Sequence, residues 1–222
     1  MKKTFKIYIF RHGETTFNRD KRFTGFKDAK LAPEGIRHAK IIAKKLKNKK
    51  FQVAFQTRLS RSKDTLREVL KFHPECEMII EDDRMIERIY GDLNGTTHSM
   101  FIKKMGKKLY NLKVHGDIIT ALEPSGRREV EKILGEQEYA LIHRGFNVPP
   151  PHGESFADVE KRAKSFIKDL IVFMKGERAS IAISAHGNSI RLFRKIMEGA
   201  TIPETCSWFI PYDKVFEYHI RA

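Results

Sequence analysis

The chain has 222 residues, 41% of them hydrophobic, and a formal net charge of +15 at pH 7. This length allows a single α/β domain with a hydrophobic core, which we place at 1–222. No apolar run in the sequence approaches the ~20 residues of a membrane-spanning helix, and the apolar stretch after the basic N-terminus is too short for a secretory signal. We therefore expect a soluble protein of the cytoplasm.

Predicted strands and helices alternate along the chain. Apolar, β-prone segments at 5–10, 53–57 and 180–185 predict short buried strands separated by segments of helical periodicity. A helix predicted to begin near Pro33 places these apolar side chains toward the core: Ile36, Ala39, Ala43 and Leu46. A second helix does the same with Leu66, Val69 and Leu70. The alternation predicts a doubly wound α/β fold, a mostly parallel sheet with helices on both faces.

The C-terminal third continues this pattern. Ser155 and Asp158 form the sequence signature of a capping box. The helix that follows carries a core stripe of Phe156, Val159, Ala163, Phe166, Leu170 and Phe173. A last helix with Phe193, Ile196 and Met197 is predicted to stop at Gly199, and 214–220 is predicted to close the sheet as a strand.

Residues 96–143 interrupt the alternation. Helical segments at about 99–113 and 126–135, the second capped by Ser125, are predicted around glycine-containing turns. No internal repeat or low-complexity linker marks a domain boundary. We interpret 96–143 as an inserted helical cap within the one domain.

The residues that follow each strand indicate where chemistry takes place, because ligands of parallel α/β sheets bind outside the carboxyl ends of the strands. Arg11-His12-Gly13-Glu14 follows the first strand, Arg58 to Arg61 the second, and His186-Gly187-Asn188 the third. No P-loop or dinucleotide fingerprint accounts for them, and the two cysteines lack metal-ligand spacing. We therefore predict a site without a metal.

Histidines together with arginines favour phosphoryl transfer. Arginine forks match phosphate oxygens bidentately, and a neutral imidazole is a competent nucleophile near pH 7. A phosphohistidine on His12 would divide one displacement into two in-line steps, with the surrounding donors stabilising charge on the phosphoryl oxygens.

Several segments, in the same order, resemble the histidine phosphatase superfamily, and within it cofactor-dependent phosphoglycerate mutase. They are RHGETTFN (11–18), RFTGFKDAKLAPEG (22–35), ERIYGDLNG (87–95), RGFNVPPPHGES (144–155) and AHGNSIR (185–191). The resemblance covers both ends of the chain and most of the middle. It fails between His98 and about Ala140.

The resemblance implies a role for each matching residue. His12 is implied to be phosphorylated, Arg11, Arg61 and His186 to bind the phosphoryl group, and Glu87 to act as acid and base. Implied substrate-binding positions are Asn18, Thr24, Gly25, Tyr90, Arg144, Gly187 and Asn188.

Structural alternatives stand beside some of these roles. Glu87 is near other acidic residues and is alternatively a solvated charge, while Tyr90 is alternatively a packing residue and Thr24 with Gly25 a simple turn. His98 and His143 occupy positions where the family carries permanently charged residues that hold the substrate carboxylate. Free imidazole has a pKa of ~6.5, so a carboxylate grip by these two histidines would depend on pH.

The working hypothesis is a cytoplasmic mutase of glycolysis and gluconeogenesis that interconverts 3-phosphoglycerate and 2-phosphoglycerate, primed by 2,3-bisphosphoglycerate and using no metal. The first alternative is a phosphatase of small phosphate esters on the same scaffold. The second is a binding protein for RNA or another polyanion, suggested by the net charge. Lysine runs at 44–50 and 103–108 lack interleaved aromatic residues, so we expect a small phosphorylated metabolite as partner and neither nucleic acid nor membrane. Assembly into a homo-oligomer is left open.

Overall fold

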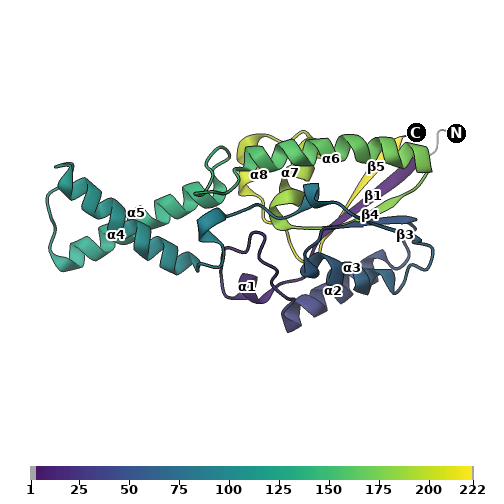
Figure 1. Cartoon of the computed structure of the whole chain (residues 1–222), viewed down its shortest axis with the longest axis horizontal. Coiled ribbons are helices and arrows are strands. Elements are labelled where there is room, and N and C mark those ends of the chain that lie inside the picture. Colours follow the sequence, from purple (N-terminus) through teal and green to yellow (C-terminus); the bar gives the residue numbers. More distant parts are fainter. Residues whose placement is uncertain (1–3, 222) are drawn as a thin grey trace.

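A mixed sheet forms the centre of the protein (Figure 1). The computed structural model describes residues 4–221. Within them the strands are β1 (Thr4–Arg11), β2 (Val53–Gln56), β3 (Met78–Glu81), β4 (Ile181–Ala185) and β5 (Val215–Arg221), in the spatial order β3-β2-β4-β1-β5. The first four run parallel and β5 is antiparallel to β1, which confirms the mostly parallel sheet. The sequence analysis missed β3, a short strand at the sheet edge whose side chains are mostly exposed.

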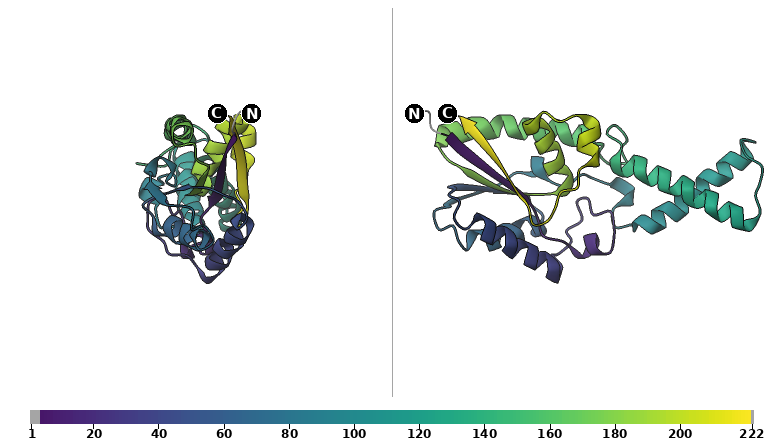
Figure 2. Two further views of the ribbon diagram at one scale, coloured as in Figure 1. Left: turned by 90° about the vertical axis from the view of Figure 1, so that its right-hand side faces the viewer. Right: turned by 180° about the vertical axis from the view of Figure 1, so that it is seen from behind.

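Helices cover both faces of the sheet, as predicted (Figures 1 and 2). They are α1 (Thr16–Arg19), α2 (Pro33–Leu46), α3 (Ser60–Leu70), α4 (His98–His115), α5 (Pro124–Arg144), α6 (Phe156–Glu177), α7 (Gly187–Glu198) and α8 (Ile202–Ser207), with short 3₁₀ segments at Asp83–Met85 and Gly91–Leu93. Alternate residues of β1 face opposite layers. Ile7 and Ile9 pack with α6 and α7, whereas Tyr8 and Phe10 pack with α2 and α3.

The structure can be compared with the predictions made for the start of α6, the end of α7 and the buried face of α2. The capping box of Ser155 and Asp158 is present at the start of α6, and α7 ends at Gly199 in the left-handed conformation. The prediction for Ile36 was wrong, because its side chain is 44% exposed. The buried residues of α2 are Gly35, Ala39, Ile42, Ala43 and Leu46, and a Cβ added to Gly35 would lie 1.9 Å from the carbonyl oxygen of Glu14.

The predicted insertion is a helical hairpin of α4 and α5 that projects away from the sheet, so that only its base adjoins the rest of the domain (Figures 1 and 2). The prediction that Ser125 caps the second helix was wrong. Helix α5 begins at Pro124 with Glu123 as its N-cap, because proline at the first helical position loses no hydrogen bond. It continues to Arg144, well beyond the predicted end, and therefore carries His143 and Arg144 to the sheet. None of the helices within residues 4–221 is long and apolar enough to cross a membrane.

The two helices of the hairpin approach each other most closely at two glycines. A Cβ added to Gly106 would lie 1.8 Å from the carbonyl oxygen of Glu131, and one added to Gly135 would lie 2.1 Å from that of Ile102. Because the atoms in the way are backbone, the helices would have to move apart to admit a methyl group.

We expect Gly106→Ala to lower the free energy of unfolding by about 1–3 kcal/mol, the range for overpacking, although alanine has the higher helix propensity. The matched control is Gly176→Ala in α6, where an added Cβ meets nothing within 4 Å and stability should hold or rise. Denaturant unfolding followed by circular dichroism measures both variants. Equal stability of the two would contradict the close crossing.

Candidate active site

The carboxyl ends of three adjacent strands bring the two histidines together. Arg11 pairs with Ala185 in the parallel β1–β4 register, and the N–H of His12 donates to the Ala185 carbonyl at 3.0 Å. The ring centroids of His12 and His186 are 4.9 Å apart, and both side chains are buried. The convergence expected from the strand ends is therefore present.

Hydrogen bonding fixes the tautomer of His12. Its Nδ1 lies 2.7 Å from the carbonyl oxygen of Gly13, which can only accept, so Nδ1 carries the proton. No described group bonds Nε2, whose lone pair is left for a ligand. Burial, then the charges of Arg61 and Arg11, hold the pKa of His12 well below its ordinary value. The imidazole is thus neutral at neutral pH.

Gly13 itself is fixed from two sides. Its N–H donates to the hydroxyl of Thr65 on α3 at 3.0 Å. Its Cα packs against the start of α2, since an added Cβ would lie 2.1 Å from the Gly35 carbonyl oxygen. Two helices therefore set the position of the carbonyl that orients His12.

His186 has the opposite tautomer. The guanidinium Nε of Arg61 donates to Nδ1 of His186 at 3.3 Å, so Nδ1 is unprotonated. The proton is on Nε2, which lies 2.8 Å from the hydroxyl oxygen of Thr57. Burial is the largest cause of its lowered pKa, followed by Arg61 and His12. His186 can thus donate one N–H from Nε2, to Thr57 or to a phosphoryl oxygen.

Two arginines flank the histidines. The guanidinium of Arg61 donates to the carbonyls of Gly25 and Lys27, both at 2.8 Å, and burial lowers its pKa to about 10, which leaves it cationic at neutral pH. Arg11 donates to the Ile210 carbonyl at 2.9 Å and lies 4.0 Å from the ring centroid of Tyr212. Backbone and ring contacts hold both cations without neutralising them.

A cavity of about 200 Å³ opens beside this group, below the ~300–1,000 Å³ typical of sites for drug-sized ligands. Most of the predicted residues line it: Arg11, Asn18, Thr24, Glu87, Tyr90, His98, His143, Arg144, Gly187 and Asn188. His12, Arg61 and His186 do not line it and are buried, as is Gly25. The side-chain oxygen of Asn18 accepts from the N–H of Thr15, so its amide N–H groups are what it can offer a ligand.

Glu87 is a buried side chain of this cavity, 7% exposed, and not a solvated surface charge. Its Oε1 accepts from the backbone N–H groups of Arg88 at 2.8 Å and Asn188 at 3.2 Å, the latter at the start of α7. The side-chain amide of Asn188 in turn donates to the hydroxyl of Tyr90 at 3.2 Å. One carboxylate therefore faces a cavity that is otherwise basic.

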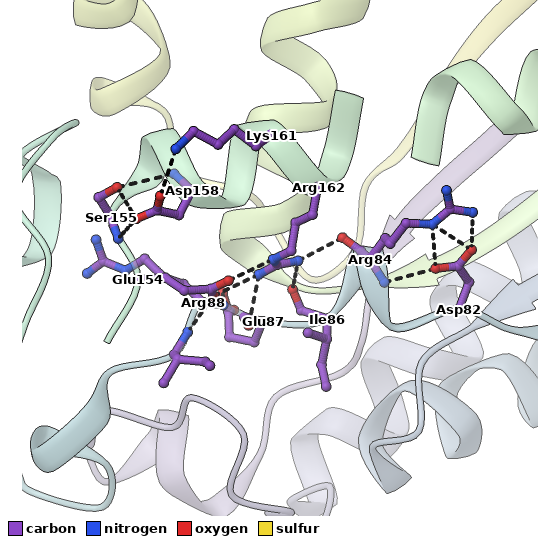
Figure 3. A network of polar contacts seen from close by, with 11 residues as sticks. Asp82, Arg84, Ile86, Glu87, Arg88, Glu154, Ser155, Asp158, Lys161 and Arg162 are labelled. Atoms are coloured by element: carbon purple, nitrogen blue, oxygen red, sulfur yellow. Dashed lines mark hydrogen bonds and ion pairs between the residues drawn. The ribbon is translucent and has the colours of Figure 1, made fainter. Parts of the chain in front are cut away.

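Figure 3 shows how α6 holds the segment that carries Glu87. The guanidinium of Arg162 donates to the carbonyls of Arg84, Ile86 and Glu87 at 2.7, 2.8 and 3.1 Å. It also pairs with Glu154 at 3.0 Å, and Glu154 accepts the N–H of Ile89 at 2.9 Å. The sequence analysis missed this clamp, although Glu154 lies within a quoted motif.

His98 and His143 lie in an aromatic cluster. Tyr139 stacks on His143 with ring centroids 5.0 Å apart, and its hydroxyl lies 3.1 Å from Nδ1 of His98. Burial, then Arg144, lowers the pKa of His143 to about 2, and burial also lowers that of His98. Both side chains are neutral at working pH in the unliganded protein and supply no permanent charge.

Sequence reasoning missed further residues that line the cavity. They are Lys21, Arg22, Phe23, Arg191, Phe209, Ile210 and Tyr212. Arg22 and Arg191 stand within the quoted motifs and were available as signals. Tyr212 lies in the loop before β5, and only the tertiary fold places it beside Arg11 and at 6.5 Å from the ring centroid of His12.

Within residues 4–221 no group of three or more His, Cys, Asp or Glu side chains is arranged to hold a metal ion. A buried, neutral histidine pair lies beside two arginines at the strand ends, and such a set of residues is chemically suited to binding a phosphoryl group. The model of the histidine phosphatase superfamily (branch 1) matches residues 7–117 and 119–218, and this protein belongs to that superfamily.

Relatives within the superfamily include mutases. A 2,3-bisphosphoglycerate-dependent phosphoglycerate mutase of Pseudoalteromonas atlantica is 26% identical, with 91% of this chain and 88% of the relative covered. A phosphoglycerate mutase of Schizosaccharomyces pombe is 30% identical, with 88% and 80% covered.

Solved structures with the same fold include both kinds of enzyme. Phosphoglycerate mutase from Bacillus anthracis has a TM-score of 0.70 at 15% identity, with 100% of this chain and 92% of that chain covered. The α-ribazole phosphatase from Shigella flexneri has a TM-score of 0.68 at 18% identity, with 96% and 89% covered.

The buried histidines predict a pH dependence of stability. His12, His143 and His186 have folded-state pKa values below those of the unfolded chain, so the unfolded chain binds more protons as pH falls below ~6.5. The contribution of these histidines to the free energy of unfolding is therefore fully present above that pH. It declines below that pH, by up to about 1.4 kcal/mol per pH unit for each histidine.

Urea unfolding at pH 7, 6 and 5 measures this slope. His143→Gln should lower the slope by about one bound proton, that is by about 1.4 kcal/mol per pH unit. An identical slope in wild type and His143→Gln would show that His143 is protonated in the folded protein.

The clamp on the Glu87 segment predicts a positioning effect. Arg162→Lys keeps a charge but cannot hold three carbonyls, so turnover should fall by about 10–100-fold with little change in KM. Lys161→Met is the control, since Lys161 is exposed and pairs only with Asp158 among described residues. A rise in KM with unchanged kcat would contradict a role through Glu87.

Proposed function

We propose that this protein interconverts 3-phosphoglycerate and 2-phosphoglycerate through a phosphohistidine on His12, primed by 2,3-bisphosphoglycerate. The observation that carries the proposal is the free Nε2 of a neutral His12, set between Arg11 and Arg61, with the carboxylate of Glu87 in the adjoining cavity. The partner is a small phosphorylated metabolite of the cytoplasm.

The residues fit the bisphosphorylated primer. Besides Arg11, the cavity is lined by Lys21, Arg22, Arg144 and Arg191, which suit a ligand with more than one anionic group. When bound, 2,3-bisphosphoglycerate supplies the phosphoryl group. His12 would then take that phosphoryl group on Nε2 as the ester O–P bond breaks, and Glu87, which must carry a proton at this stage, would give it to the leaving oxygen and become a carboxylate.

The return step runs the same bonds in reverse. Glu87 takes the proton of a phosphoglycerate hydroxyl, the hydroxyl oxygen attacks the phosphoryl group on His12, and the N–P electron pair returns to Nε2. Arg11, Arg61 and the Nε2–H of His186 stabilise the charge on the equatorial oxygens during both transfers. The phosphoglycerate has now become the bisphosphate, which carries its original phosphoryl group and the one received from His12. If its original phosphoryl group is transferred to His12 next, the other phosphoglycerate isomer is released.

Two observations favour transfer between metabolites over transfer to water. The cavity is small, so a bound phosphoglycerate would leave little room for water beside the buried His12. The relatives named above are mutases at 26% and 30% identity.

A specific observation favours the phosphatase alternative. His98 and His143 are neutral where the family resemblance expects permanent cations, so part of the usual carboxylate grip is missing. A phosphatase for an ester without a carboxylate would not need it.

One assay separates the two functions. Purified protein is given 3-phosphoglycerate with and without 2,3-bisphosphoglycerate, and 2-phosphoglycerate and free phosphate are measured separately. We expect 2-phosphoglycerate to form faster in the presence of the bisphosphate, with little free phosphate, and acid-labile labelling of the protein. His12→Asn should abolish both, while His219→Asn retains them. Free phosphate as the main product would favour the phosphatase.

A further inference from the structure

Arg191 is a buried cation with no ion-pair partner. It lies near the start of α7, is 4% exposed and lines the cavity. Its guanidinium bonds the side-chain oxygen of Asn188 and donates to the carbonyl of Trp208 at 2.7 Å, while its Nε is buried without a hydrogen-bond partner. No carboxylate within residues 4–221 pairs with it.

The neighbours of Arg191 add positive charge instead of compensating it. Arg88 is fully buried, with Nε and one terminal nitrogen unpartnered, and the guanidinium groups of Arg88 and Arg191 lie 4.8 and 5.2 Å from the ring centroid of Phe156. Arg144, half-buried at the end of α5, also forms no ion pair with a described residue. Burial, then Arg144, lowers the pKa of Arg191 to about 9.

Glu87 is the one carboxylate among the residues that line the cavity with Arg144 and Arg191, and its Oε1 already accepts from two backbone N–H groups. Buried charge of one sign is costly unless an anion joins it. An anionic ligand would remove, on binding, the free-energy cost of leaving these buried arginines unpaired.

We propose that Arg191 binds the carboxylate of phosphoglycerate beside Arg144, which the family resemblance already implies to hold substrate. Arg191 would thereby make up for the permanent charges that are missing at His98 and His143. This inference rests on the proposed function for its choice of ligand. Asn188 joins the carboxylate subsite to the reacting centre, because its side chain bonds Arg191 and its N–H bonds Glu87. Binding of the carboxylate at this subsite would thereby place the adjacent substrate hydroxyl near Glu87, the group proposed to take the proton of that hydroxyl.

The test compares two ligands that differ only at the proposed contact. Glycerol 3-phosphate carries a CH₂OH group where 3-phosphoglycerate carries the carboxylate. Calorimetric titration of unphosphorylated protein should give wild type at least about a tenfold preference for 3-phosphoglycerate, the effect of a charged hydrogen bond. Arg191→Met should lose that preference and keep its affinity for glycerol 3-phosphate. Arg191→Lys, which keeps the charge but not the fork, should be intermediate.

Arg194→Met is the matched control. Arg194 lies on the same helix, pairs with Glu198 and does not line the cavity, so its removal changes the net charge equally and should leave the preference intact. Thermal unfolding without ligand monitors folding, and Arg191→Met should be no less stable than Arg194→Met because a buried unpaired charge is gone. If Arg191→Met does not fold, the Arg191→Lys titration decides.

Each outcome has one meaning. Equal losses for both ligands in Arg191→Met, or no loss for either, would overturn the assignment of Arg191 to the carboxylate. A wild type without preference would also overturn it, while acid-labile labelling of His12 would still stand. If the preference follows Arg191 but no 2-phosphoglycerate forms, the carboxylate subsite holds and the mutase proposal fails.

Discussion

The hydrogen bond from Nδ1 of His12 to the Gly13 carbonyl is the contact on which the site depends. It commits the ring proton to Nδ1 and leaves the lone pair of Nε2 free. The contact exists because α3 holds the N–H of Gly13 through Thr65 and α2 packs on its Cα at Gly35. A side chain at either glycine would push the backbone apart, so the chemistry at His12 is set by backbone packing as much as by the histidine.

The second constraint is electrostatic. Burial and the nearby arginines keep His12 and His186 neutral, whereas Arg61 stays cationic because guanidinium begins from a far higher pKa. A buried cluster thus contains neutral imidazoles and a permanent cation side by side. Lysine in place of Arg61 would not keep this division, since it loses its proton more readily on burial and cannot donate to two carbonyls and a ring nitrogen in a fixed plane.

Sequence patterns predicted the features that short-range chemistry determines. Strand ends, the capping box of α6 and the glycine end of α7 depend on neighbouring residues, and His12, His186 and Glu87 followed from motifs. Arg162 and the length of α5 could not be predicted this way, because they depend on contacts between distant segments. The state of His143 is the clearest case: its ordinary pKa is near neutrality, and only the tertiary packing under Tyr139 and beside Arg144 removes its charge.

The cavity also has a cost that the rest of the fold must offset. Arg88, Arg144 and Arg191 place positive charge in or near the cavity without a carboxylate partner among residues 4–221, which destabilises the folded protein. Two apolar clusters, one on each face of the sheet, supply compensating burial through side chains such as Phe10, Phe156 and Phe193. The apolar clusters therefore offset the cost of keeping the site positively charged, although they lie outside it. If Arg144 and Arg191 bind the substrate carboxylate as we propose, stability and ligand selection are coupled here, because replacing these arginines with apolar residues would stabilise the fold and remove the discrimination between anions.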